Sequence, residues 1–88
     1  MTPEEESIRA DRAKELLENP LVIEAFAFIE AEITEKLMNS PARDTEGREK
    51  LYLMNQLLKR VKKHFESTVN TGYLAKRTIA DRLKKQAI

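Results

Sequence analysis

The chain has 88 residues, of which 41% are hydrophobic and 35% are charged, and its formal net charge at pH 7 is +1. Two glycines, three prolines and no cysteine are typical of a helical domain, and they exclude disulfides and thiolate metal sites. On folding, a domain of this length buries only about 60–65% of the surface that its extended chain exposes. No apolar run in the sequence approaches the roughly 20 residues that a helix needs to span a membrane.

Two helices are predicted in the first half of the chain. Thr2 can cap a helix over residues 3–18, because Pro3 suits the first helical position and Glu5 completes a capping box. Asn19 and Pro20 interrupt this helix and start a second one over residues 20–38. Apolar side chains cover more than half of the circumference of the second helix, which indicates partners on two sides.

A third helix is predicted over residues 44–70, with Asp44 as its cap. Its apolar residues recur at alternating spacings of three and four, as in a coiled coil. They are named the apolar seam: Leu51, Met54, Leu58, Val61 and Phe65. Gly47 costs roughly 1 kcal/mol against alanine inside a helix. Either the helix begins after Gly47 or another backbone crosses closely there, and we favour the close crossing.

The length of the third helix is the main reason to expect an oligomer. Residues 44–70 would span about 40 Å as a helix, whereas a compact chain of this size is only roughly 30 Å across. Part of the apolar seam would therefore project into water unless a second subunit covered it. Exposed apolar patches of this kind mark interfaces.

Gly72 is expected to end the third helix, and a fourth, basic helix is expected over residues 73–86. The predicted fold is all-α, a single domain over residues 1–88 in which residues 20–38 and 44–70 form an antiparallel hairpin within a small bundle. We expect these residues to pack within the hairpin and in the oligomer interface: Val22, Phe26, Ile29, Ile33, Leu51, Met54, Leu58, Val61 and Phe65.

Charge is divided between the two halves of the chain. Residues 1–40 hold four basic and ten acidic side chains, a net charge of −6, whereas residues 41–88 hold twelve basic and five acidic ones, a net charge of +7. This asymmetry predicts a polyanionic partner for the basic half, acid-to-base self-association, or neutralisation of one half by the other within a bundle.

The sequence offers little support for catalysis. His64 is the only histidine, and the carboxylate of Glu66, two residues away, faces elsewhere on a helix. Glu32 and Glu35 are three residues apart, but no Glu-x-x-His sequence accompanies them, so a di-metal site is not supported. We expect no enzyme activity, no metal, no cofactor and no small-molecule substrate.

Basic side chains of the second half are the candidates for contact with nucleic acid. Phosphate contacts by such residues would give an affinity that depends on salt and not on base sequence. Neither a helix-turn-helix spacing nor an aromatic platform for stacking bases accompanies them. The candidates are Lys59, Arg60, Lys62, Lys63, Lys76, Arg77, Arg82, Lys84 and Lys85.

The chain carries two blocks with a family resemblance, SPARDTEGREKLYLMNQLLKRVKKHF and VNTGYLA, and RADRAKELLENPLVIEAF fits the same pattern nearer the start. Over about residues 8–75 it resembles a small uncharacterised family of proteins encoded by tailed bacteriophages. The resemblance implies an infected bacterial cytoplasm or a virion, and a place among head-assembly or genome-packaging functions. It implies no activity and no site residues.

The function expected first is that of a non-enzymatic phage protein that works by helix-mediated assembly, as a homo-oligomer or with another phage protein. One alternative is a DNA-binding packaging or regulatory factor that uses the basic half. Another is an inhibitor that presents the acidic face of residues 3–38 to a host protein. The start of the chain is acidic and polar, unlike a secretory signal, and no membrane partner is expected.

Overall fold

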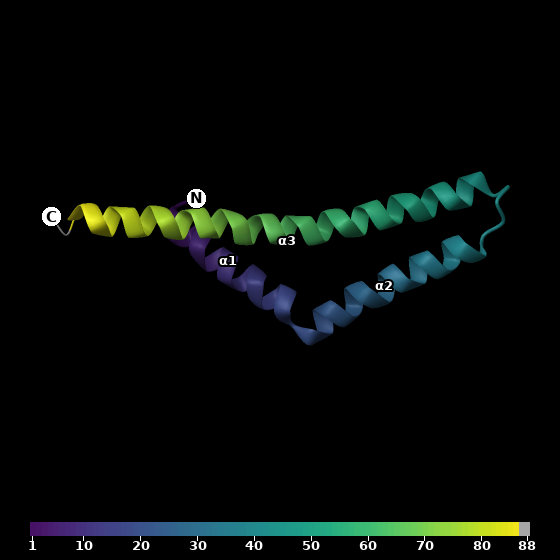
Figure 1. Ribbon diagram of the computed structural model, residues 1–88, viewed down its shortest axis with the longest axis horizontal. Coiled ribbons are helices and arrows are strands. Elements are labelled where there is room, and N and C mark those ends of the chain that lie inside the picture. Colours follow the sequence, from purple (N-terminus) through teal and green to yellow (C-terminus); the bar gives the residue numbers. More distant parts are fainter. Residues whose placement is uncertain (87–88) are drawn as a thin grey trace. The chain divides into compact units, whose positions relative to one another are not determined.

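The computed structural model describes residues 1–86, and every regular element among them is a helix (Figure 1). The helices are α1 (Pro3–Glu18), α2 (Pro20–Asn39) and α3 (Thr45–Gln86). None of the described helices is both long enough and apolar enough to cross a membrane. The all-helical class predicted from the sequence is confirmed.

Side-chain caps explain where the three helices begin. Oγ1 of Thr2 accepts a hydrogen bond from a backbone N–H of the first turn of α1 at 3.2 Å. Oδ1 of Asn19 does the same for α2 at 2.9 Å, and Oδ1 of Asp44 for α3 at 3.1 Å. Each contact satisfies a backbone donor that the start of a helix leaves without an intrahelical partner.

The structure corrects the expected break between residues 70 and 73. α3 runs through Asn70 and Gly72 without interruption, and no glycine among the described residues has a positive φ. Gly72 therefore does not end a helix. Its missing side chain instead admits α1, because a Cβ at Gly72 would overlap the Cβ of Ala10 and lie 3.1 Å from the backbone oxygen of Glu6.

The close crossing expected at Gly47 is not found there. α3 begins before this residue, at Thr45, so the helix does not start after the glycine either. The atoms nearest to a Cβ built at Gly47 all belong to the carboxylate of Asp44, the cap of the helix. The close approach of a second backbone occurs at Gly72, two-thirds of the way along α3.

Contacts within the chain divide it into two compact units. Unit 1 contains Met1–Glu18 and the chain from Lys63 onward, so it joins α1 to the second half of α3. Unit 2 contains Asn19–Lys62, so it joins α2 to the first half of α3. The single domain, the hairpin and the bundle expected from the sequence stay predictions.

Small residues form the core of unit 1. The buried ones are Ala10, Ala13, Gly72 and Ala75. Such residues let two helix axes approach toward the short end of the usual 8–10 Å range. Two ion pairs join α1 to α3 beside this core, Lys76 Nζ to Asp11 Oδ1 at 2.7 Å and Arg82 Nη1 to Glu4 Oε1 at 3.2 Å. Because both pairs are about half exposed, each contributes only about 0–1 kcal/mol.

Unit 2 has a smaller core, in which Ile33 of α2 is buried. Near the turn, Nη1 of Arg48 donates to Oγ of Ser40 at 3.2 Å. Farther from the turn, Nζ of Lys62 lies 3.5 Å from Oε1 of Glu30. The two contacts pair later residues of α3 with earlier residues of α2, so these segments run in opposite directions.

Candidate helix-packing interface

The structure divides the nine predicted packing residues by their exposure. Ile33 is buried. Five are half-buried: Val22, Phe26, Leu51, Leu58 and Phe65. Three are exposed: Ile29, Met54 and Val61. Phe65 belongs to unit 1 and the other eight to unit 2. The chain therefore brings part of the predicted set together and leaves the rest facing water.

α3 carries an uncovered apolar strip in unit 2. We name it the exposed strip: Leu53, Met54, Leu57 and Val61, with exposed fractions of 57%, 51%, 61% and 43%. Their spacing puts these four residues on one side of the helix. The neighbouring side, which faces α2, is half-buried at Leu51, Asn55, Leu58 and Lys62. Contact with α2 therefore covers one flank of the apolar seam and leaves the other flank bare.

Ile29 of α2 lies beside this strip. Glu30 and Lys62 face each other across the two helices, which run in opposite directions. In a right-handed helix, the preceding residue lies about 100° around the axis. Because the two helices run in opposite directions, the residues before Glu30 and Lys62 both lie on the same side of the pair. Ile29 and Val61 are therefore neighbours on one side of unit 2, and both are exposed.

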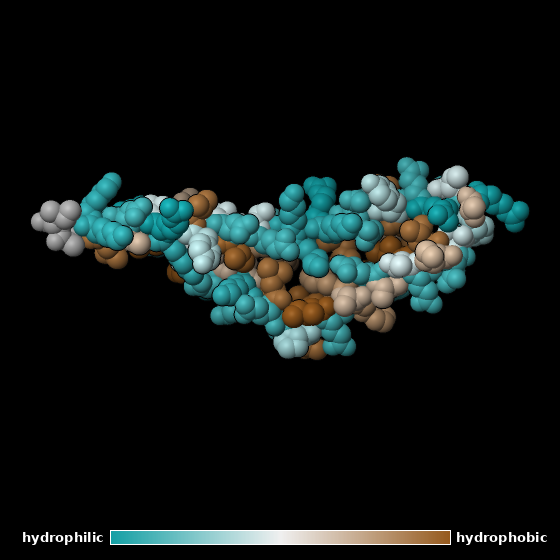
Figure 2. All heavy atoms as spheres, viewed as in Figure 1, coloured by the Kyte–Doolittle hydropathy of each residue, from teal (hydrophilic) through white to brown (hydrophobic). Residues whose placement is uncertain are grey.

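Other apolar residues of α2 extend this surface. Leu21 and Ala25 line a shallow groove together with Ile29 near the start of α2. In the view of Figure 2, hydrophobic residues lie along α2, and the visible side of α3 beside them is mainly hydrophilic. We give the name open side of unit 2 to the surface formed by these residues of α2 and α3: Leu21, Ala25, Ile29, Met54, Leu57 and Val61.

The apolar seam of α3 continues past Phe65 into unit 1 at the same alternating spacing. Its next positions are Thr68, Gly72, Ala75 and Ile79. Here α1 covers the helix, and both Gly72 and Ala75 are buried. Residues at this spacing are therefore covered by α1 in unit 1, whereas Met54 and Val61 are exposed in unit 2.

Sequence reasoning missed the small-residue contact between α1 and α3. Its signal is present, since Ala10 and Ala13 are three residues apart in α1, as are Gly72 and Ala75 in α3. Interpreting Gly72 as a helix end concealed this pattern. Such a stripe predicts a close approach of two helices only when the glycine is known to lie within one.

Three of the nine candidate nucleic-acid contacts are engaged inside the chain. The pairs are Lys62 with Glu30, Lys76 with Asp11, and Arg82 with Glu4. Each joins a basic residue of the second half to an acidic residue of the first half. Neutralisation of one half by the other within a bundle stays a prediction. The other six are exposed and form no ion pair among the described residues: Lys59, Arg60, Lys63, Arg77, Lys84 and Lys85.

Lys62 is also separated from the lysines that neighbour it in sequence. Its Nζ lies 5.8 Å from the ring centre of Phe26, which keeps the side chain at the contact with α2. A cation over an aromatic ring is attracted by the ring's quadrupole, while the aliphatic stem covers apolar surface. Lys59 and Lys63 lie on a side of α3 away from the exposed strip, since neither shares its spacing.

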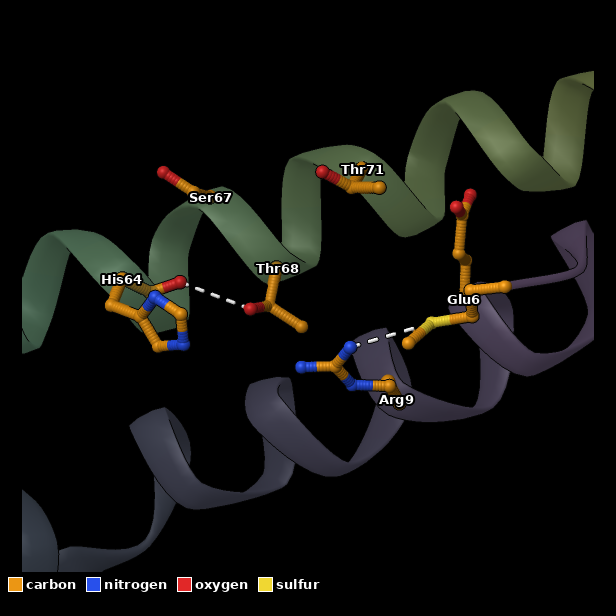
Figure 3. Close-up of a pocket in the computed structure, with 7 residues that line it drawn as sticks. Glu6, Arg9, His64, Ser67, Thr68 and Thr71 are labelled. Carbon is orange, nitrogen blue, oxygen red and sulfur yellow. Dashed lines mark hydrogen bonds between the residues drawn. The ribbon is translucent and has the colours of Figure 1, made fainter.

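A hollow of unit 1, lined mainly by residues with polar side chains, contains His64 (Figure 3). Its lining residues are Met1, Glu6, Arg9, His64, Ser67, Thr68 and Thr71. Nη1 of Arg9 donates to Sδ of Met1 at 3.3 Å, and Oγ1 of Thr68 donates to the backbone oxygen of His64 at 3.0 Å. Among the described residues, no hydrogen bond joins the imidazole to a hydroxyl or a carboxylate, as an activated nucleophile requires.

Acidic residues and the histidine do not converge anywhere in residues 1–86 as a group that could hold a metal ion. The absence of enzyme activity stays a prediction. Comparisons of the chain with protein-family models, with curated proteins and with solved structures found no match.

Proposed function

We propose that the protein is non-enzymatic and acts through helix-mediated assembly of copies of its own chain. The observation that carries this proposal is the exposed strip of α3, whose four apolar residues face water in a single chain. Covering such a surface contributes about 25 cal/mol for each Å² of apolar area removed from water. Contiguous exposed apolar residues therefore favour an interface.

The small core of the single chain supports the proposal. Its buried side chains are three alanines and Ile33, and no large side chain is fully buried among the described residues. Alanine and glycine remove little apolar area from water, whereas fixing the backbone costs about 1–2 kcal/mol per residue. In the proposed assembly, burial of the open side between chains adds the stabilisation that the small core lacks.

The assembling element in this proposal is an antiparallel hairpin of α2 and the first half of α3. The contacts of Arg48 with Ser40 and of Lys62 with Glu30 support this pairing. Residues on the facing sides of the hairpin pack within the chain. Ile29, Met54 and Val61 then pack between chains, which assigns them the interface role expected from the apolar seam.

The proposed setting is a phage-infected bacterium or the virion, and the proposed process is head assembly or genome packaging. The resemblance of about residues 8–75 to a tailed-phage protein family supports this setting. An apolar surface that a second chain would cover agrees with a role in assembly.

Replacing one residue of the exposed strip with glutamate tests the proposal. Val61→Glu places a charge at the contact and is expected to weaken association at least about tenfold, which corresponds to about 1.4 kcal/mol. Tyr52→Glu is the matched control, because Tyr52 is also exposed but lies on the opposite side of α3. Light scattering measures the mass of each variant. Wild-type mass for Val61→Glu would contradict the proposal.

Contact with DNA is the second candidate, favoured by the exposed cations that form no ion pair among the described residues. Reversing the charges of Lys59 and Lys63 should then abolish binding to duplex DNA while leaving helicity and mass unchanged. Fluorescence anisotropy with a labelled duplex at low salt measures this. The candidate fails if the unmodified protein does not bind the duplex under these conditions.

A further inference from the structure

The open side of unit 2 fits a second copy of the same chain in one particular orientation. Granting the proposed self-assembly, on which this step rests, we infer that the second copy docks there with its α3 antiparallel to the first α3. α2 and residues 45–62 of both copies then form a four-helix bundle. Each copy uses the same surface in this contact, so the assembly closes as a two-fold symmetric dimer.

The spacing of the exposed residues sets the pairing of the two α3 helices. Met54 and Val61 lie on the open side, seven residues or two helical turns apart. In an antiparallel pair, Met54 of each copy faces Val61 of the other. The two-fold axis then passes between Leu57 and Leu58, and both apolar pairs are removed from water together.

The distribution of charge along α3 favours the antiparallel orientation. Residues 59–63 hold four cations, Lys59, Arg60, Lys62 and Lys63, whereas residues 52–56 hold no charged side chain. Antiparallel pairing about the stated axis sets these two segments opposite each other. Parallel pairing would bring this basic segment of one copy level with the same segment of the other, and like charges at the rim of an interface repel.

α2 supplies a reciprocal contact at the same axis. The contacts of Arg48 with Ser40 and of Lys62 with Glu30 set the alignment of α3 with α2 in unit 2. In this alignment, the middle of residues 54–61 lies beside Ile33. Lys36 is two turns after Ile29 and so lies on the open side, where it pairs with Glu32 at 3.0 Å within one chain. In the dimer, Glu32 of each copy meets Lys36 of the other, a self-complementary arrangement that a two-fold contact requires.

Disulfide formation between single-cysteine variants of the full chain tests this geometry, because the chain has no cysteine of its own. Met54→Cys and Val61→Cys are oxidised separately and as an equal mixture. Facing positions on helices packed 8–10 Å apart can satisfy the Cα separation of about 7 Å that a disulfide allows. Identical positions are offset by about 10 Å along the axis and cannot.

The mixture is expected to form a covalent dimer, containing up to about half of the chains because random pairing makes half of the dimers mixed. Each variant alone is expected to form little. Tyr52→Cys mixed with Lys63→Cys is the matched control, since these two positions are also equidistant from the axis but lie on the opposite side of α3. All four positions are exposed, so circular dichroism should show wild-type helicity for each variant.

The mass of the unmodified protein by light scattering distinguishes failure of this geometry from failure of the proposed assembly. A dimer in which Met54→Cys cross-links with itself would establish parallel pairing and overturn the inference. If the protein is a dimer but neither mixture cross-links, or if the control mixture cross-links, the interface lies elsewhere. Either result would overturn the inference about orientation but not the proposed self-assembly. A fully helical monomer would overturn both.

Discussion

Gly72 and Gly47 both lie inside α3, but their missing side chains have different consequences. At Gly72 an added Cβ would overlap Ala10 of α1, whose backbone cannot move without separating the two helices. At Gly47 an added Cβ would meet the carboxylate of Asp44, which ends a flexible side chain and can rotate away. Helix propensity alone treats the two glycines alike.

Gly72→Ala is therefore expected to destabilise the protein, although alanine is the better helix former by about 1 kcal/mol. Overpacking against Ala10 should lower the free energy of unfolding by about 1–3 kcal/mol. Gly47→Ala is the control, and its gain in propensity should be offset by the loss of the Asp44 cap to within about 1 kcal/mol. Urea unfolding at one fixed protein concentration measures both. Stabilisation by Gly72→Ala would contradict the close approach of α1.

The starts of the three helices could be predicted from the sequence, because capping is a local interaction. Thr2, Asn19 and Asp44 cap their helices through side-chain oxygens two or three residues from the donor, so the sequence alone contains the whole contact. The exposure of Ile29, Met54 and Val61 was not predictable in the same way. Periodicity defines the apolar side of a helix, but the partner that covers each part of that side comes from distant residues.

At the scale of the element, α3 is a 42-residue helix where two helices were expected. The sequence Asn70-Thr71-Gly72 is compatible with a helix end and equally with a helix interior that accommodates a neighbour. Contact with α1 distinguishes these alternatives, and that contact joins residues about 60 positions apart in the chain. Local sequence could not decide it.

Backbone chemical shifts measured by NMR check the continuity of α3. Residues 68–76 are expected to show uninterrupted helical Cα shifts, because the backbone remains helical through Gly72. Amide exchange in this segment should be slower than at the end of the helix near Gln86, since Gly72 and Ala75 are buried against α1. Non-helical shifts at Thr71 and Gly72 would restore the two separate helices.

At the scale of the whole molecule, the division of charge and the exposed apolar surface suggest different forces for self-association. The three ion pairs between helices join the acidic half to the basic half inside one chain, which leaves fewer charges to attract a second copy. The open side of unit 2 carries six apolar residues. We therefore expect apolar burial, and not attraction between the halves, to hold copies together.

Salt separates these two forces. An assembly driven by apolar burial should persist, or strengthen slightly, as sodium chloride rises to about 1 M, where the screening length falls to about 3 Å. Acid-to-base association between exposed charges should weaken over the same range. Size-exclusion chromatography with light scattering at several salt concentrations measures the difference, and dissociation at high salt would favour the acid-to-base alternative.

Sedimentation equilibrium of the unmodified protein at low micromolar concentration tests most directly whether a single chain shelters its own apolar surface. The proposed two-fold assembly predicts a mass of twice the 10.2 kDa of one chain, with dissociation and loss of helicity on dilution. A mass of 10.2 kDa at every concentration, with helicity unchanged, would contradict it.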